Sequence, residues 1–151
     1  MPERNSQFTP IPVASVAPEA TAPIAWWVRV VVVLGALLLA TGAVLALVNP
    51  AMLVAPQDEI NGAVHIYAGY LASRNLALAI MLVAVLSLGA KRALGNVMVL
   101  VALVQLLDVC MNCAEGRWTL VPGVFIFGLL FLIGAARLSG YPFWRSSFWT
   151  Q

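Results

Sequence analysis

The sequence predicts an all-α membrane protein: a four-transmembrane-helix bundle, antiparallel, with a disordered N-terminal tail. Of its 151 residues 62% are hydrophobic and only 9% are charged, and the mean hydropathy is +0.96, whereas ordinary globular chains carry about 25% charged residues. Four apolar stretches reach or approach the roughly 18 residues that a bilayer-crossing helix needs: 25–48, 64–88, 94–111 and 118–136. Because hydrocarbon offers the backbone no hydrogen-bond partner, these stretches must be helices.

The charged residues divide unevenly between the two sides of such a bundle. One side is basic, with Arg4, Arg29, Lys91, Arg92, Arg137 and Arg145. The other side is mainly acidic, with Asp58, Glu59, Glu115 and Arg117. Because cytoplasmic loops are enriched in Lys and Arg, we expect a multi-pass protein of the inner (plasma) membrane with both termini in the cytoplasm. The small, scattered net charge of +2 argues against a nucleic-acid partner.

Residues 1–24 are rich in Pro, Ala, Ser and Thr. Such a composition cannot bury enough apolar surface to offset the entropy of ordering, so we expect a disordered cytoplasmic tail. The first helix opens with Trp26, Trp27 and Arg29, which suit the headgroup level of a membrane. Pro50 cannot continue a helix and ends this one at Asn49. We expect the loop 51–62 to be solvated and acidic, with a short interfacial segment as the alternative.

The second stretch carries polar side chains that an apolar helix normally excludes. At 100° per residue, Tyr67, Tyr70 and Arg74 share one helical face, whereas His65 points to the opposite side. If the hydrocarbon begins near position 68, Arg74 lies roughly 9 Å below that boundary. An ionisable residue at such a depth is by default a candidate functional residue, because burying it costs several kcal/mol unless it is paired or hydrated.

The third stretch, which follows a basic turn predicted at 89–95, carries a polar stripe formed by Gln105, Asp108, Asn112 and Glu115. Counted from a boundary near Asn112, Asp108 lies roughly 6 Å deep and Gln105 roughly 10 Å deep. The depths of Arg74 and Asp108 match, which predicts an intramembrane ion pair with Gln105 as a hydrogen-bonding companion. Two alternatives stay open: the pair only fixes helix packing, or Arg74 reaches the outer headgroups without meeting Asp108.

The fourth stretch, 118–136, has no ionisable residue and is predicted to form a wall of the bundle, which we place at 25–138. The aromatic and basic tail 139–151 predicts an amphipathic anchor on the cytoplasmic leaflet.

Cys110 and Cys113 form a CxxC near the outward-facing end of the third stretch. They are a candidate redox pair, but the C-terminal end of a helix disfavours a thiolate. A structural disulfide or two packed thiols is the alternative. Together with His65 they make a weak set of metal ligands, and we expect no metal site.

The segments Tyr70-Leu-Ala-Ser-Arg74-Asn-Leu-Ala-Leu-Ala and Leu103-Val-Gln105-Leu-Leu-Asp108 resemble the small four-helix membrane proteins of the DoxX-like families. In this resemblance Arg74 and Asp108 match recurrent polar positions, and Cys110 and Cys113 match none. DoxX-type relatives include subunits associated with quinone-linked sulfur oxidation, while many such families have no assigned activity. The resemblance therefore implies an accessory membrane subunit, with a quinone as a candidate cofactor.

Three functions stay open at this point. The first is an accessory subunit that binds the head of a lipid-like or quinone-like molecule in an outward-opening pocket lined by Arg74, Gln105, Asp108, Tyr67, Tyr70 and Asn112. The second is a membrane enzyme that uses Cys110 and Cys113 for thiol–quinone redox, or Asp108 for acid/base chemistry on a hydrophobic substrate. The third is a packing subunit of a larger complex. The expected partners are the lipid bilayer and either a hydrophobic small molecule or a partner membrane subunit.

Overall fold

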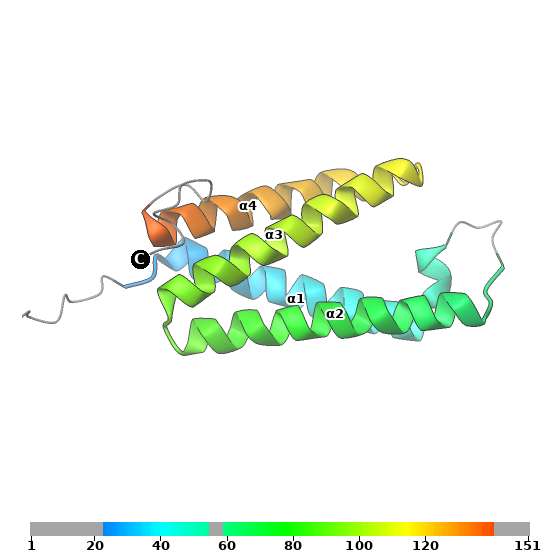
Figure 1. The fold of residues 1–151 in the computed structure, drawn as a ribbon, viewed down its shortest axis with the longest axis horizontal. Helices are drawn as coiled ribbons and strands as arrows, with labels where there is room; N and C mark the ends of the chain where they lie inside the picture. Colours follow the sequence, from blue (N-terminus) through cyan, green and yellow to red (C-terminus); the bar gives the residue numbers. More distant parts are fainter. Residues whose placement is uncertain (1–22, 55–58, 141–151) are drawn as a thin grey trace, which may run out of the picture.

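The structure, a computed structural model, describes residues 23–54 and 59–140. Within these residues it is helical and contains no strand (Figure 1): α1 Trp26–Val48, the 3₁₀ turn η1 Pro50–Leu53, α2 Gly62–Ser87, α3 Lys91–Ala114 and α4 Val121–Ser139. All four α-helices are long and apolar enough to cross a membrane, which confirms the predicted helical class. Nearly all of the tail predicted at 1–24, and most of the anchor predicted at 139–151, lie outside the described residues.

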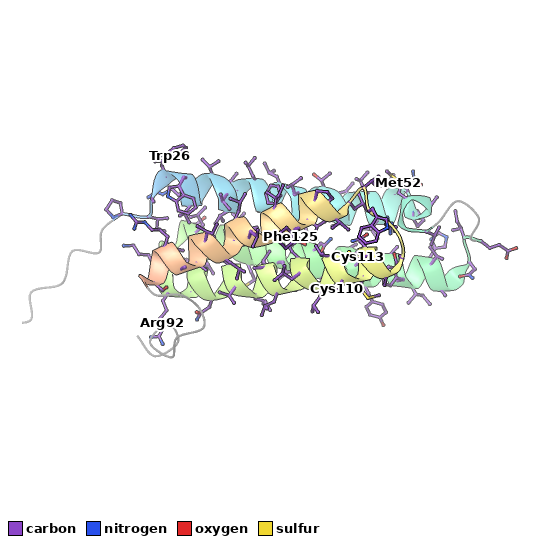
Figure 2. All side chains as sticks on the ribbon, turned by 90° about the horizontal axis from the view of Figure 1, so that it is seen from above. Trp26, Met52, Arg92, Cys110, Cys113 and Phe125 are labelled. Atoms are coloured by element: carbon purple, nitrogen blue, oxygen red, sulfur yellow. The ribbon has the colours of Figure 1, made fainter. Side chains whose placement is uncertain are left out.

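Consecutive helices run in opposite directions and form two hairpins, α1 with α2 and α3 with α4 (Figure 1). We call the end at which α1 and α3 begin the basic end, because it carries Arg29, Lys91, Arg92 and Arg137. The opposite end, with Glu59 and Glu115, is the acidic end. Figure 2 shows Trp26 and Arg92 at the basic end and Met52, Cys110 and Cys113 toward the acidic end.

The main apolar core occupies the half of the bundle next to the basic end. All four helices contribute buried side chains to it, among them Val28, Leu82, Met98 and Phe131. A second, smaller cluster consists of alanines that join only α1 and α2, in the half next to the acidic end. In α3 no residue beyond Ala102 is fully buried, so the two hairpins share little apolar contact in that half.

Two glycines let the helices of the main core approach closely. A Cβ at Gly35 of α1 would collide with the ring of Phe131 of α4, and one at Gly134 of α4 would collide with Cε of Met98 of α3. Phe131 and Met98 are both fully buried. The bulky side chain of one helix therefore fills the space that a glycine leaves on its neighbour, as in the close packing of membrane helices.

The helix boundaries agree with the sequence in one place and depart from it in another. α1 ends at Val48, as the Asn49–Pro50 pair predicted, and Pro50 begins the 3₁₀ turn η1. The basic turn predicted at 89–95 is wrong, because α3 already begins at Lys91. Only Gly89 adopts a left-handed conformation there, with φ 65°. Lys and Arg are good helix formers whose long side chains can extend away from apolar surface, so their charge does not end a helix.

Candidate functional site

The structure brings Arg74 of α2 and Asp108 of α3 together across the two hairpins. Nη2 of Arg74 lies 3.1 Å from Oδ2 and 3.3 Å from Oδ1 of Asp108. The two side chains stay 40% and 31% exposed, respectively. The pair is therefore a real contact that is open on one side rather than enclosed in the core.

The register of the two helices explains why these residues meet. At about 1.5 Å per residue, Arg74 lies about 18 Å along α2 from Gly62, and Asp108 lies about 9 Å along α3 from Ala114. Since the side chains are in contact, α2 extends about 9 Å further toward the acidic end than α3 does. This projecting part of α2 carries Tyr67, and Tyr70 lies between it and Arg74.

The pair leaves several hydrogen-bonding groups unused. A guanidinium has five N–H donors, and here only Nη2 bonds to the carboxylate. Among the described residues, Nε and Nη1 of Arg74 have no hydrogen-bond partner, and neither oxygen of Asp108 accepts from any other side chain. A two-nitrogen, two-oxygen arrangement would be stronger and more fixed in geometry. The Arg74–Asp108 contact thus joins α2 to α3 and leaves Nε and Nη1 of Arg74 able to donate to another group.

Gln105 does not act as the predicted companion of the pair. Its amide makes no hydrogen bond to Arg74 or Asp108, and its Cβ lies 3.5 Å from where a Cβ on Gly128 of α4 would be. The reason is the helical rotation of 100° per residue, which turns position 105 about 60° away from Asp108, toward α4. Polar residues on one stripe of a helix can therefore face two different neighbours.

Asn112 belongs to the same stripe but bonds to its own helix. Its Nδ2 donates to the backbone oxygen of Asp108 at 2.7 Å, a bond within α3. This contact adds a polar atom beside Asp108 without contacting Arg74.

Tyr67 and Tyr70 lie on the same face of α2 as Arg74 and are 60% and 73% exposed. Tyr70 precedes Arg74 by four residues, so the two are surface neighbours on the helix. No hydrogen bond among the described residues joins either hydroxyl to Arg74. The tyrosines extend the exposed face from the ion pair toward the acidic end, and Ser73 Oγ donates to the Tyr70 carbonyl at 2.9 Å.

Cys110 and Cys113 are both free thiols, so this structure holds no disulfide between them. Cys110 is exposed and Cys113 is half-buried. Both lie near the end of α3 that leads into the α3–α4 turn (Figure 2). The described residues contain no group of three or more His, Cys, Asp or Glu side chains that could hold a metal ion.

Two contacts near the site were not expected from the sequence. Nη2 of Arg117, in the α3–α4 turn, donates to the backbone oxygen of Met52 in η1 at 3.1 Å. Nδ2 of Asn75 lies 3.4 Å from where a Cβ on Gly42 would be, so Gly42 leaves room for that amide between α1 and α2. The Arg117 contact joins segments 65 residues apart. No local sequence signal marks a contact of that kind.

Comparisons of the chain with models of protein families, with curated proteins and with solved structures find no match. The resemblance to the DoxX-like families therefore stays a prediction from the residues quoted above. Any functional conclusion has to come from the geometry of the site.

Proposed function

We propose that this chain is a multi-pass protein of the inner (plasma) membrane, of DoxX-like type. In this proposal it binds the polar head of a lipid-like or quinone-like molecule at Arg74 and Asp108. Four helices of membrane-spanning length support the first part. The concentration of Lys and Arg at the basic end supports a cytoplasmic location for that end and for both termini.

The observation that carries the binding proposal is the exposure of the ion pair on an apolar surface. Arg74 and Asp108 are 40% and 31% exposed, and Met81, on the same face of α2 as Arg74, is 50% exposed. In a bilayer this side of the pair would face hydrocarbon, where an incompletely satisfied charge costs several kcal/mol. A bound molecule that supplies a polar head and an apolar body removes that cost.

The remaining hydrogen-bonding groups define the chemistry of the head. Nε and Nη1 of Arg74 are donors, so the head must present acceptor oxygens, either a carbonyl or an anionic group. Asp108 then orients the guanidinium and balances its charge. Tyr70 and Met81 flank Arg74 along α2 and offer apolar surface to the body of the molecule.

The experiment is to purify the full chain in mild detergent and to identify co-purifying lipids and quinones by native mass spectrometry. We expect Arg74→Gln and Asp108→Asn to lose a molecule that the wild type retains, while both variants keep their helicity and monodispersity. Arg29→Gln, which removes an exposed charge at the basic end, is the matched control and should retain the molecule. Equal retention by wild type and Arg74→Gln would refute the binding role.

The same preparation distinguishes the other two functions. If the exposed pair is instead covered by a partner subunit or a second copy, wild type will run as an oligomer that Arg74→Gln dissociates, with no change in bound molecules. If the protein is a thiol–quinone enzyme, a Cys110→Ser, Cys113→Ser variant will lose quinone reduction completely. For a binding protein, that double variant should retain the same molecule as wild type.

A further inference from the structure

A cavity of about 400 Å³ lies at the basic end, far from the Arg74–Asp108 pair. It is formed where α1 begins, α3 begins and α4 ends, and all of its lining belongs to the described residues. Its size falls within the roughly 300–1,000 Å³ typical of small-molecule sites. The lining residues that matter here are Ile24, Val28, Lys91, Arg137, Leu138 and Ser139.

The charge around this cavity is positive. Lys91 comes from the first turn of α3 and Arg137 from the last turn of α4, so two chain segments that are distant in sequence each supply a cation. The acidic residues of the described part, Glu59, Asp108 and Glu115, all lie in the half of the molecule next to the acidic end. The helix dipoles do not determine the sign of the charge at the cavity. The N-termini of α1 and α3 contribute partial positive charge there, and the C-terminus of α4 contributes partial negative charge.

The lining contains both apolar and polar side chains. Val28 is fully buried and Ile24 is 8% exposed, so both contribute an apolar surface. Ser139 Oγ donates to the backbone oxygen of Ala136 at 3.2 Å, which commits its proton to the helix. The cationic side chains in the lining are Lys91 and Arg137. The occupant should carry an anion next to an apolar portion.

We propose that this cavity binds the phosphate group of an anionic phospholipid from the cytoplasmic leaflet. Arg matches the geometry of phosphate oxygens, Lys binds them as a point charge, and basic pockets between helices on the cytoplasmic side are suited to anionic headgroups. The proposal rests on the membrane orientation given above. It does not depend on the Arg74 site, which lies in the other half of the molecule.

The test measures binding to the full chain in neutral detergent, by native mass spectrometry and by thermal unfolding. The probes are phosphatidylglycerol, phosphatidylcholine and inorganic phosphate. We expect phosphatidylglycerol to bind and to raise the unfolding temperature, and the other two to have little effect. Removing both cations in Lys91→Gln, Arg137→Gln should weaken phosphatidylglycerol binding about 30-fold, or about fivefold for each charge.

Arg29→Gln is the control, because it removes one charge from the same end but does not line the cavity. It should bind like the wild type, as should Lys91→Arg and Arg137→Lys, which keep the charge. If the double Gln variant fails to fold, the two single Gln variants carry the test. Equal binding of both lipids, or equal losses in Arg29→Gln and in the cavity variants, would overturn the proposal.

Inorganic phosphate that stabilises the chain as well as the lipid does would overturn the assignment to a phospholipid. Arg74→Gln must leave phosphatidylglycerol binding unchanged, so that failure of the proposed function and failure of this inference are distinguishable.

Discussion

Asp108→Asn tests whether the Arg74–Asp108 contact holds the two hairpins together. The substitution keeps the size of the side chain and removes its charge, which leaves the Arg74 guanidinium opposite a neutral amide. At the observed 3.1 Å and an effective dielectric constant of about 20, the Coulomb attraction is about 5 kcal/mol. Desolvation and the ordering of two side chains offset most of that attraction.

The exposure of the two side chains sets the expected net effect. Exposed ion pairs contribute roughly 0.2–1 kcal/mol, whereas removing one partner of a fully buried pair costs about 3–5 kcal/mol. The pair here lies between these limits, with 40% and 31% of the side chains exposed. We therefore expect Asp108→Asn to lower the free energy of unfolding by about 1–2 kcal/mol.

A double-mutant cycle isolates the interaction from other effects of the substitutions. The four proteins are wild type, Arg74→Gln, Asp108→Asn and the double variant, each unfolded reversibly in mixed detergent micelles. We expect a coupling free energy of about 1 kcal/mol, so the double variant should be more stable than the sum of the single changes implies. Additivity within about 0.3 kcal/mol would show that the contact does not stabilise the bundle.

Two further predictions concern packing and orientation. Gly35→Ala should lower the free energy of unfolding by about 1–3 kcal/mol, because its Cβ meets the buried ring of Phe131. Gly69→Ala is the control: the space around Gly69 is open, so this change should be neutral or stabilising by up to about 1 kcal/mol. Thermal unfolding of both variants in detergent compares the two effects. In intact cells carrying the chain with Cys110→Ser and Cys113→Ser, so that no native thiol reacts, a membrane-impermeant maleimide should label Glu59→Cys but should label Arg92→Cys only after permeabilisation. The reverse pattern would contradict the proposed orientation.

The helices were predictable because a long apolar stretch fixes both the secondary structure and its length. The matching depths of Arg74 and Asp108 also followed from the sequence, since a short connection makes neighbouring helices run antiparallel and each residue adds about 1.5 Å. The rotation of each helix about its axis was not predictable. Gln105 faces α4 rather than the pair because that rotation is set by packing such as Met98 against Gly134.

The start of α3 and the cavity at the basic end were missed for different reasons. Lys91 was placed in a turn because charge at a membrane edge suggests a boundary, yet its helix propensity favours the first turn of α3. The cavity depends on three helix ends meeting in space, and Arg137 is far from Lys91 in the chain. Only the tertiary structure shows that Lys91 and Arg137 line the same cavity.

The confinement of the main core to one half of the bundle has a consequence for motion. Separating the hairpins at the acidic end breaks the Arg74–Asp108 and Arg117–Met52 contacts. It exposes no fully buried side chain of α3 beyond Ala102. Such subglobal opening requires much less free energy than global unfolding. Such opening therefore gives a bulky amphiphile a lateral way in between the hairpins, while the core around Phe131 stays closed.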